Sequence, residues 1–248
     1  MEFLQDERDQ LHKFFSYRKA SIKDVEYEVL FQNISYLKFE SLLKFLKNQL
    51  GVSEEFKFLG NSTSLDVFYI DPNNLRQIPI RHSLNSASDI SEFCKTNILS
   101  NLPHDITFKN SFKIDNKWSK LNIQNYDIKI NLKNELEFNK TRKEFISSNS
   151  NLSHISVDAN RAFKEIGNMK KFNTEKDLLK TFRLKNRFSF MYHGNTRIDL
   201  TIVKSSKKEI NSRGFEEMIP VKEFIDSNIN DEEKSYEIEV EFFPNRQI

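Results

Sequence analysis

The chain has 248 residues, of which 38% are hydrophobic, 30% are charged and 23 are Phe, enough to bury a sizeable core as one large β domain or two ordinary domains. It contains no apolar run that predicts a signal peptide or a membrane span, no glycine-rich phosphate loop and no zinc-type Cys/His spacing. The single cysteine, Cys94, excludes an internal disulfide and fits a reducing compartment. Because the net charge is only +2, any site that binds a polyanion requires local clustering of basic residues.

Three segments carry apolar residues at helical spacing. Phe3 to Phe15 shows this spacing among many charges, which predicts a surface or docking helix. From Phe39 to Leu50 the apolar positions recur every three or four residues, and Gly51 stands where a C-terminal cap belongs. A third helix is predicted near Ser88 to Leu99, where Cys94 lies on the apolar face and is expected to pack in the core.

Five other segments alternate apolar and polar residues, which places one class of side chain on each face of a sheet. The turn His193-Gly194-Asn195 between two of them predicts a β-hairpin. Two polar stretches, 139–153 and 212–233, are expected to be connectors or insertions. The alternating segments are 25–31, 127–138, 182–190, 197–202 and 237–242, and they predict a mainly β protein of the α+β class.

The polar positions of two of these strands are sorted by the sign of their charge. One strand carries Arg183, Lys185 and Arg187, and the other carries Glu237, Glu239 and Glu241. For a single strand, a solvated outer face is the ordinary interpretation. However, like charges about 7 Å apart along one face repel each other, and a plain surface would mix the signs. The sorting therefore predicts counter-ions, with a cation opposite the glutamates and a polyanion opposite the basic strand.

A metal and polyphosphate complex meets both demands. Carboxylate oxygens are ligands for hard divalent cations such as Mg²⁺ or Mn²⁺, and Arg and Lys complement phosphate oxygens. Closing the strands into a barrel would turn the charged faces inward and leave an apolar exterior, which the predicted helices can cover. The sequence thus predicts an antiparallel β-barrel with peripheral helices and a charged interior.

Charged motifs span residues 25–242 and are Val25-Glu26-Tyr27-Glu28, Tyr126 to Leu132 with Glu135, Arg183 to Arg187, Arg197 to Thr201, and Tyr236 to Glu241. Their order resembles that of the triphosphate tunnel metalloenzymes. Within this family, the chain is most similar to the RNA 5′-triphosphatases of fungi and of mRNA-capping enzymes from large cytoplasmic DNA viruses. Yeast cytoplasmic linear plasmids, whose genes are AT-rich, encode similar capping enzymes, and the bias of this chain toward Asn, Lys, Ile and Phe agrees with a viral or plasmid origin.

The resemblance implies a closed antiparallel barrel of eight strands and a hydrolase acting on phosphoric anhydrides. The implied reaction is metal-dependent removal of the γ-phosphate from 5′-triphosphate RNA, with Mg²⁺ or Mn²⁺ as cofactor, as the first step of cap formation. Residues 1–248 would form one tunnel domain, the N-terminal part of a longer capping enzyme. The implied partners are the triphosphate end of RNA and a fused or associated guanylyltransferase and cap methyltransferase, in the cytoplasm and without a membrane.

The resemblance also assigns roles to the carboxylates. Glu26, Glu28 and Glu241 would hold the divalent metal. Glu239 would orient the attacking water through the metal shell, and Glu135 would assist it.

The remaining assignments concern the substrate. Lys185 and Arg187 would act in catalysis by holding the γ-phosphate, Asp199 would fix the basic strand by ion pairing, and Glu237 would pair with a basic side chain. Further substrate-binding positions of lower rank are Arg183, Arg197 and Lys129. The family also places a basic residue on an early strand of the sheet, and Arg76, Arg81, Lys109 and Lys113 all remain open for it.

Two features depart from the family pattern. A basic residue often follows two positions after the second glutamate of the first motif, but this chain has Leu30 there, so one phosphate contact is expected to be missing. The sequence ends at Ile248, shortly after the last motif, where relatives continue, which suggests a domain taken from a longer enzyme.

Two alternatives remain open. The same site can serve another tunnel-family activity, such as an inorganic triphosphatase or a nucleoside triphosphatase, because any triphosphate suits it. A non-catalytic nucleic-acid-binding or regulatory module could use the basic strand alone, although this leaves the glutamates unexplained. Metal-dependent release of the γ-phosphate separates the last hypothesis from the others.

Overall fold

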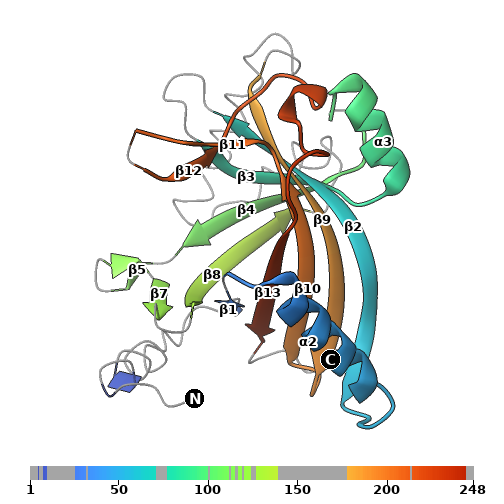
Figure 1. Cartoon of the computed structure of the whole chain (residues 1–248), viewed down its shortest axis with the longest axis vertical. Helices are drawn as coiled ribbons and strands as arrows, with labels where there is room; N and C mark the ends of the chain where they lie inside the picture. Colours follow the sequence, from blue (N-terminus) through green and yellow to red (C-terminus); the bar gives the residue numbers. More distant parts are fainter. Residues whose placement is uncertain are drawn as a thin grey trace, which may run out of the picture.

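Antiparallel strands dominate the part of the chain that the structure describes, and it contains few helices, as the sequence predicts (Figure 1). The computed structural model describes residues 5, 8–9, 26–31, 33–70, 77–99, 101–111, 113–114, 117–118, 120–123, 127–138, 178–212 and 214–243. At positions 26, 78–79, 108–111, 113–114, 117–118, 120 and 132–138 it describes the backbone only. None of the helices within these ranges is long and apolar enough to cross a membrane.

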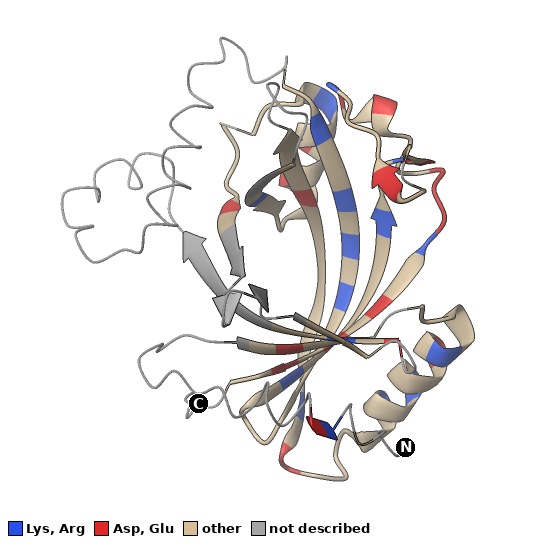
Figure 2. Ribbon diagram, turned by 90° about the vertical axis from the view of Figure 1, so that its left-hand side faces the viewer, with Lys and Arg blue, Asp and Glu red and all other residues tan. Residues whose placement is uncertain are grey.

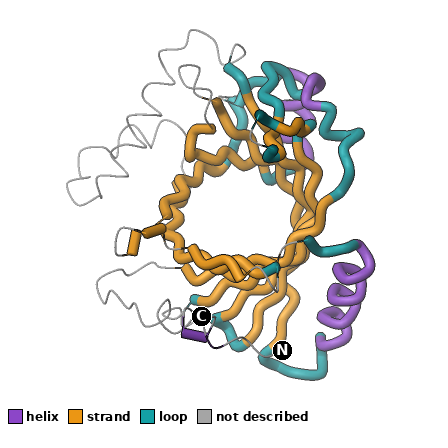
Figure 3. Tube along the Cα trace, turned by 60° about the vertical axis from the view of Figure 1, so that its left-hand side comes forward, coloured by secondary structure: helices purple, strands orange, loops and turns teal. Residues whose placement is uncertain are grey.

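One large sheet contains most of the strands. Along it the order is β1 (Glu26–Phe31), β13 (Ser235–Phe242), β10 (Thr196–Ser205), β9 (Lys180–Tyr192), β2 (Phe56–Ile70), β3 (Gln77–Leu84), β4 (Asp105–Ser111), β8 (Ile128–Phe138) and β7 (Lys120–Ile123). In addition, β1 pairs with β8 along its whole length, so the first strand of this order is joined to the eighth. Seen from the side chosen in Figure 3, the strands follow one another around a ring.

Two short hairpins complete the strands. One pairs β5 (Lys113–Ile114) with β6 (Lys117–Trp118), and the other pairs β11 (Lys208–Ile210) with β12 (Glu216–Met218).

The five alternating segments of the sequence correspond to β1, β8, β9, β10 and β13, and the predicted hairpin joins β9 to β10. Its turn places His193 and Gly194 at φ values of 49° and 69°, and the N–H of Asn195 donates to the carbonyl of Tyr192 at 3.3 Å. Positive φ at both central residues gives a turn whose twist matches that of the strands. His193 is exposed, and its Nδ1 lies 3.1 Å from Glu55 Oε1.

Helix α2 (Tyr36–Gln49) covers the apolar face of β9, β10 and β13. It begins three residues before the predicted start, because the Ser35 side chain caps it by accepting from the N–H of Lys38. Gly51, at φ 82°, follows the last turn, as predicted. The buried Phe39 and Leu46 pack in one cluster with apolar residues of the three strands.

Helix α3 (Ala87–Thr96) packs on a second cluster, centred on β2 and β9. Ser86 caps its start by accepting from the N–H of Asp89 at 3.1 Å. The helix ends three residues before the predicted Leu99, because Asn97 adopts a left-handed conformation with φ 57°. Phe93 is fully buried in this cluster. Cys94 packs against it as predicted, and burial raises the pKa of the thiol, which keeps it protonated.

The segment 212–233 is more than the polar connector that the sequence suggests. It contains β12 and a 3₁₀ turn, η4 (Ile225–Ser227), and its Val221, Phe224 and Ile229 join the cluster under α3. The buried Lys180 attaches this segment to β9, since its Nζ donates to the carbonyl of Lys222 at 2.8 Å. The apolar residues that make this anchor are spaced irregularly, so no periodic pattern reveals them. The other predicted connector, 139–153, and most of Phe3 to Phe15 lie outside the described residues.

Candidate metal and phosphate site

Many charged and polar residues of the main sheet share one face. Residues directly opposite each other in an antiparallel pair lie on the same face, and the register carries this face from strand to strand. Because α2, α3 and the apolar clusters occupy the other face, we call this one the inner face. Its described residues include Glu28, Asp66, Arg81, Ser83, Thr107, Asn131, Arg183, Lys185, Arg187, Arg197, Asp199, Thr201, Glu237, Glu239 and Glu241.

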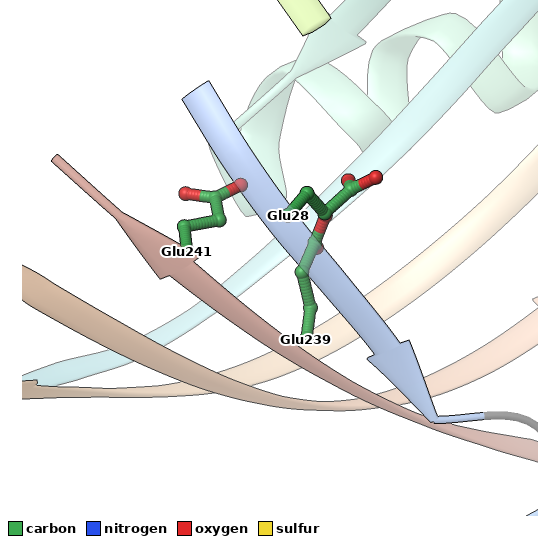
Figure 4. Close-up of side chains that lie close together, drawn as sticks. All are labelled: Glu28, Glu239 and Glu241. Carbon is green, nitrogen blue, oxygen red and sulfur yellow. The ribbon is translucent and has the colours of Figure 1, made fainter. Parts of the chain in front are cut away.

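Three glutamates of the inner face converge, and we call Glu28, Glu239 and Glu241 the carboxylate cluster. One oxygen of each lies within 4.8 Å of an oxygen of the other two. Figure 4 shows that Glu28 comes from β1 and the other two from β13. Glu28 and Glu241 stand opposite each other in the β1 and β13 pair and are only 2% and 7% exposed. Burial strengthens the repulsion between such charges, and a bound cation would offset it.

The donors of the carboxylate cluster fit a hard divalent cation. They are oxygen atoms of acidic side chains, which suit Mg²⁺ and Mn²⁺ better than softer metals. The buried Asn131 orients Glu28, because its Nδ2 donates to Glu28 Oε2 at 2.7 Å. Its Oδ1 accepts no hydrogen bond from any described residue and so remains available to a metal or to a water bound to one.

The basic residues of β9, which we call the basic row, are Arg183, Lys185 and Arg187. In Figure 2 several basic residues follow one another along a long strand, with acidic residues on other strands of the sheet. Each member of the row faces a carboxylate. The pairs are Arg183 with Glu237 at 2.6 Å, Lys185 with Asp66 at 2.5 Å and Arg187 with Asp199 at 3.4 Å.

Lys185 and Asp66 form the most deeply buried of these pairs. Burial lowers the pKa of Lys185 from 10.5 to about 8; Asp66 opposes this shift, and the positive charges of Arg81 and Arg187 add to it. Burial alone would raise the pKa of Asp66, but Lys185 and Arg81, together with a hydrogen bond from Ser83, lower it below its ordinary value. Below pH 8 the inner face thus holds a charged lysine that exposes little of itself to water.

Arg197 connects the basic row to the carboxylate cluster. Its Nη2 lies 2.5 Å from Glu241 Oε2, in an ion pair without the geometry of a hydrogen bond. Its Nε lies 3.2 Å from Asp199 Oδ2, the oxygen that also faces Arg187. The two halves of the inner face are therefore joined through Asp199 and Arg197.

The structure brings most of the sequence-predicted site residues together, with some differences in detail. Glu239, expected to act on water, lies in the same cluster as Glu28 and Glu241. The side chains of Glu26 and Glu135 lie outside the described residues, although their backbones pair with Lys133 and Lys109. Lys129 is half-buried on β8 opposite Leu30.

Sequence reasoning missed Asp66 and Asn131. Asp66 continues a polar alternation with Ser62 and Ser64, and its acidic side chain was the available signal. Asn131 is a polar position of an alternating strand and lies within the motif Tyr126 to Leu132, but neither pattern indicates its contact with Glu28. Of the four residues left open for the early basic position, Arg81 lies beside Lys185 and donates to Thr107 at 3.3 Å. Arg76, Lys109 and Lys113 have no described side chain.

No protein-family model matches the chain, and no curated protein sequence is similar to it. Solved structures of mimivirus capping enzyme triphosphatase do match. The RNA triphosphatase domain of the trifunctional mimivirus mRNA-capping enzyme shows 20% identity and a TM-score of 0.55, over 97% of this chain and 90% of that chain. A monoclinic structure of mimivirus capping enzyme triphosphatase shows 19% identity and a TM-score of 0.59, over 99% of this chain and 91% of that chain. A triclinic structure shows 19% identity and a TM-score of 0.59, over 97% of this chain and 90% of that chain. This chain therefore has the fold of the mimivirus RNA triphosphatase domain, which confirms the motif-based resemblance at the level of the fold.

Proposed function

We propose that the chain is a metal-dependent RNA 5′-triphosphatase, which converts 5′-triphosphate RNA and water into 5′-diphosphate RNA and phosphate as the first step of mRNA capping. The observation that carries this proposal is the position of the carboxylate cluster and the basic row on one inner face, joined through Asp199 and Arg197. A metal and polyphosphate complex has the two charges that this face complements.

The eight strands β1, β13, β10, β9, β2, β3, β4 and β8 would act as a closed barrel, with the inner face as the wall of a tunnel. The pairing of β1 with β13 on one edge and with β8 on the other supports this closure. A closed wall surrounds the substrate with preorganised charges and limits the water that competes for them.

Each charged group then has a role. Lys185 and Arg187 would hold the γ-phosphate, with Arg183, Arg197 and Lys129 binding the rest of the polyphosphate. Asp199 would keep Arg187 and Arg197 in place, and Glu237 would do the same for Arg183.

Glu28, Glu241 and Glu26 would hold the metal, which when bound offsets negative charge on the transferring phosphoryl group. Glu239, with Glu135, would orient the water that attacks the γ-phosphorus in line with the leaving oxygen, and would receive its proton. The charge that develops on the phosphoryl oxygens lies against Lys185 and Arg187. No covalent intermediate is required.

The mimivirus comparison supports a setting for the reaction, because that triphosphatase is one domain of a trifunctional capping enzyme. We propose that residues 1–248 form one such domain and work with a fused or associated guanylyltransferase and cap methyltransferase. The single cysteine and the resemblance to cytoplasmic viral and linear-plasmid capping systems support a cytoplasmic site of action.

The test is phosphate release from triphosphate-ended RNA, ATP and inorganic triphosphate, measured side by side with Mg²⁺, with Mn²⁺ and with EDTA. Metal-dependent release that favours the RNA supports the proposal. Preference for inorganic triphosphate or ATP would assign another tunnel-type activity, and no release from any of the three would favour a binding module.

A further inference from the structure

Arg197 occupies an oxygen that the proposed metal needs. It stands on β10 directly opposite Glu241 of β13, and its Nη2 contacts Glu241 Oε2. Glu241 is a member of the carboxylate cluster, in which each side chain offers one oxygen to the same small volume. A guanidinium at this place offsets one negative charge of the cluster and repels any other cation.

We infer that Arg197 competes with the divalent metal for Glu241 and turns toward the polyphosphate when the metal binds, so that metal and polyphosphate favour each other's binding. This inference rests on the proposed function, because it takes the carboxylate cluster as the metal site. It adds a coupling between the two ligands that operates through one side chain.

The contacts of Arg197 allow this exchange. Its Nε forms an ion pair with Asp199, which is only 1% exposed, whereas the side chain of Arg197 is 31% exposed. The guanidinium can therefore keep its contact with Asp199 while Nη2 leaves Glu241. Asp199 also faces Arg187, so the released nitrogen would lie near the basic row, where a phosphate oxygen can accept from it.

A matched ion pair stands on the same inner face. Arg183 contacts Glu237 at 2.6 Å, which is as close as the contact of Arg197 with Glu241. However, Glu237 does not belong to the carboxylate cluster. Removing the charge of Arg183 therefore changes the interior charge by the same amount without freeing a metal ligand.

The experiment measures the affinity for Mn²⁺ alone by electron paramagnetic resonance on the whole chain. Arg197→Gln is expected to bind Mn²⁺ at least about ten-fold more tightly than the parent, because a cation beside the site is removed. Arg183→Gln should change the affinity much less. A merely structural role of Arg197 would instead weaken binding. Unchanged or weaker binding by Arg197→Gln, with a melting temperature like that of the parent, would overturn the inference.

A second measurement tests the exchange and does not require Arg197→Gln to be as stable as the parent. Sulfate mimics the charge of a phosphoryl group, so the affinity for Mn²⁺ is compared in sulfate and in chloride at equal ionic strength. In the parent and in Arg183→Gln, sulfate should tighten Mn²⁺ binding by drawing Arg197 away from Glu241. An equal effect of sulfate in Arg197→Gln, or no effect in the parent, would contradict the exchange.

Glu28→Gln separates failure of this inference from failure of the proposed function. If Glu28→Gln weakens Mn²⁺ binding and Arg197→Gln has no effect, the metal site stands and only the competition is wrong. If the parent does not bind Mn²⁺, or if Glu28→Gln binds it as well as the parent, both the proposed metal site and the inference are wrong.

Discussion

Lys185 Nζ lies 2.5 Å from Asp66 Oδ2, and both side chains are buried on the inner face. The protonation state of Lys185 in this pair affects how much positive charge the basic row presents to an anion. Burial lowers the pKa of Lys185 and so disfavours its charged form, whereas the negative charge of Asp66 favours that form. The positive charge of the basic row therefore depends in part on Asp66, an acidic residue of the neighbouring strand β2.

Replacing Lys185 or Arg187 by Ala is expected to slow release of the γ-phosphate by about 10² or more, by analogy with the loss of one preorganised donor to a developing negative charge. Lys207→Ala, at an exposed position just beyond β10, is the control and should be as active as the parent. Phosphate release from triphosphate-ended RNA is the measurement. Equal activity in all three variants would contradict a role for the basic row.

The pKa of about 8 at Lys185 predicts a pH dependence. Lys185 is charged below this pH and loses its charge above it, so kcat/KM, which reports the free enzyme, should fall as the pH rises through about 8. Lys185→Arg keeps its charge, because the pKa of an arginine side chain lies far above this pH range, and its profile should stay flat to higher pH. A parent profile that is already flat between pH 7 and 9.5 would show that Lys185 stays charged or does not act.

Removing Asp66 should move that pH dependence. Asp66→Asn takes away the negative charge that favours the protonated form of Lys185, so the decline of kcat/KM should begin at a lower pH. Ser83→Ala is the matched control, because it removes only the hydrogen bond from Ser83 Oγ to Asp66 Oδ1 and leaves the charge in place. If both variants keep the parent profile, the coupling between Asp66 and Lys185 is absent.

The carboxylate cluster can be tested through stability as well as through turnover. Without metal, Glu28, Glu239 and Glu241 repel one another, and the guanidinium of Arg197 offsets only part of this repulsion. Glu241→Gln should therefore melt at the temperature of the parent or higher, although most substitutions destabilise. Mn²⁺ should stabilise the parent by about 2.7 kcal/mol at 100 times its dissociation constant and the variant much less. Thermal melting with and without Mn²⁺ checks this. An equal gain in both would remove Glu241 from the metal site, and an equal gain in Glu28→Gln would overturn the site.

Full dependence of phosphate release on a divalent cation is expected for the same reason, since the carboxylates otherwise repel the substrate. Release that continues undiminished in EDTA would contradict the metal-dependent mechanism.

Phe39→Ala tests the cover of the sheet by α2. Phe39 is 2% exposed and its ring centroid lies 5.0 Å from that of Tyr236 on β13, so the truncation should cost about 3–5 kcal/mol of unfolding free energy. Phe45 lies on the same helix but is 57% exposed, and Phe45→Ala should change stability by about 0.5 kcal/mol at most. Denaturant unfolding of the two variants makes the comparison.

Strands with a sharp alternation of charge and apolar residues, such as β9 and β13, could be predicted from the sequence together with their two faces. Strands β2, β3 and β4 were not predicted. In β2 the polar run Gly60 to Ser64 interrupts the alternation, and the register with β9 shifts between Phe58 and Gly60. In β3, Pro79 argues against an interior strand. Periodicity is a local signal, and these strands depend on pairing with distant ones.

The candidate site shows the same limit. Sorted charges predicted that a cation and a polyanion would be bound, but they could not predict which residues touch. The contact between Arg197 and Glu241 depends on the register of β10 with β13, and the contact between Lys185 and Asp66 crosses from β9 to β2. Asn131 became part of the site only because β8 lies beside β1.

The position of β1 between β8 and β13 has a consequence for how the protein is made. On the ribosome, Glu28 emerges well before Glu239 and Glu241, because these two lie on β13, the last described strand of the sheet in sequence order. A nascent polypeptide therefore lacks most of its carboxylate cluster until β13 is synthesised. Until then β1 has one unpaired edge, and pairing over such a long sequence separation is slow. Completion of the carboxylate cluster therefore requires the pairing of β1 with β13, and a metal bound by the whole cluster would stabilise only chains that have completed this pairing.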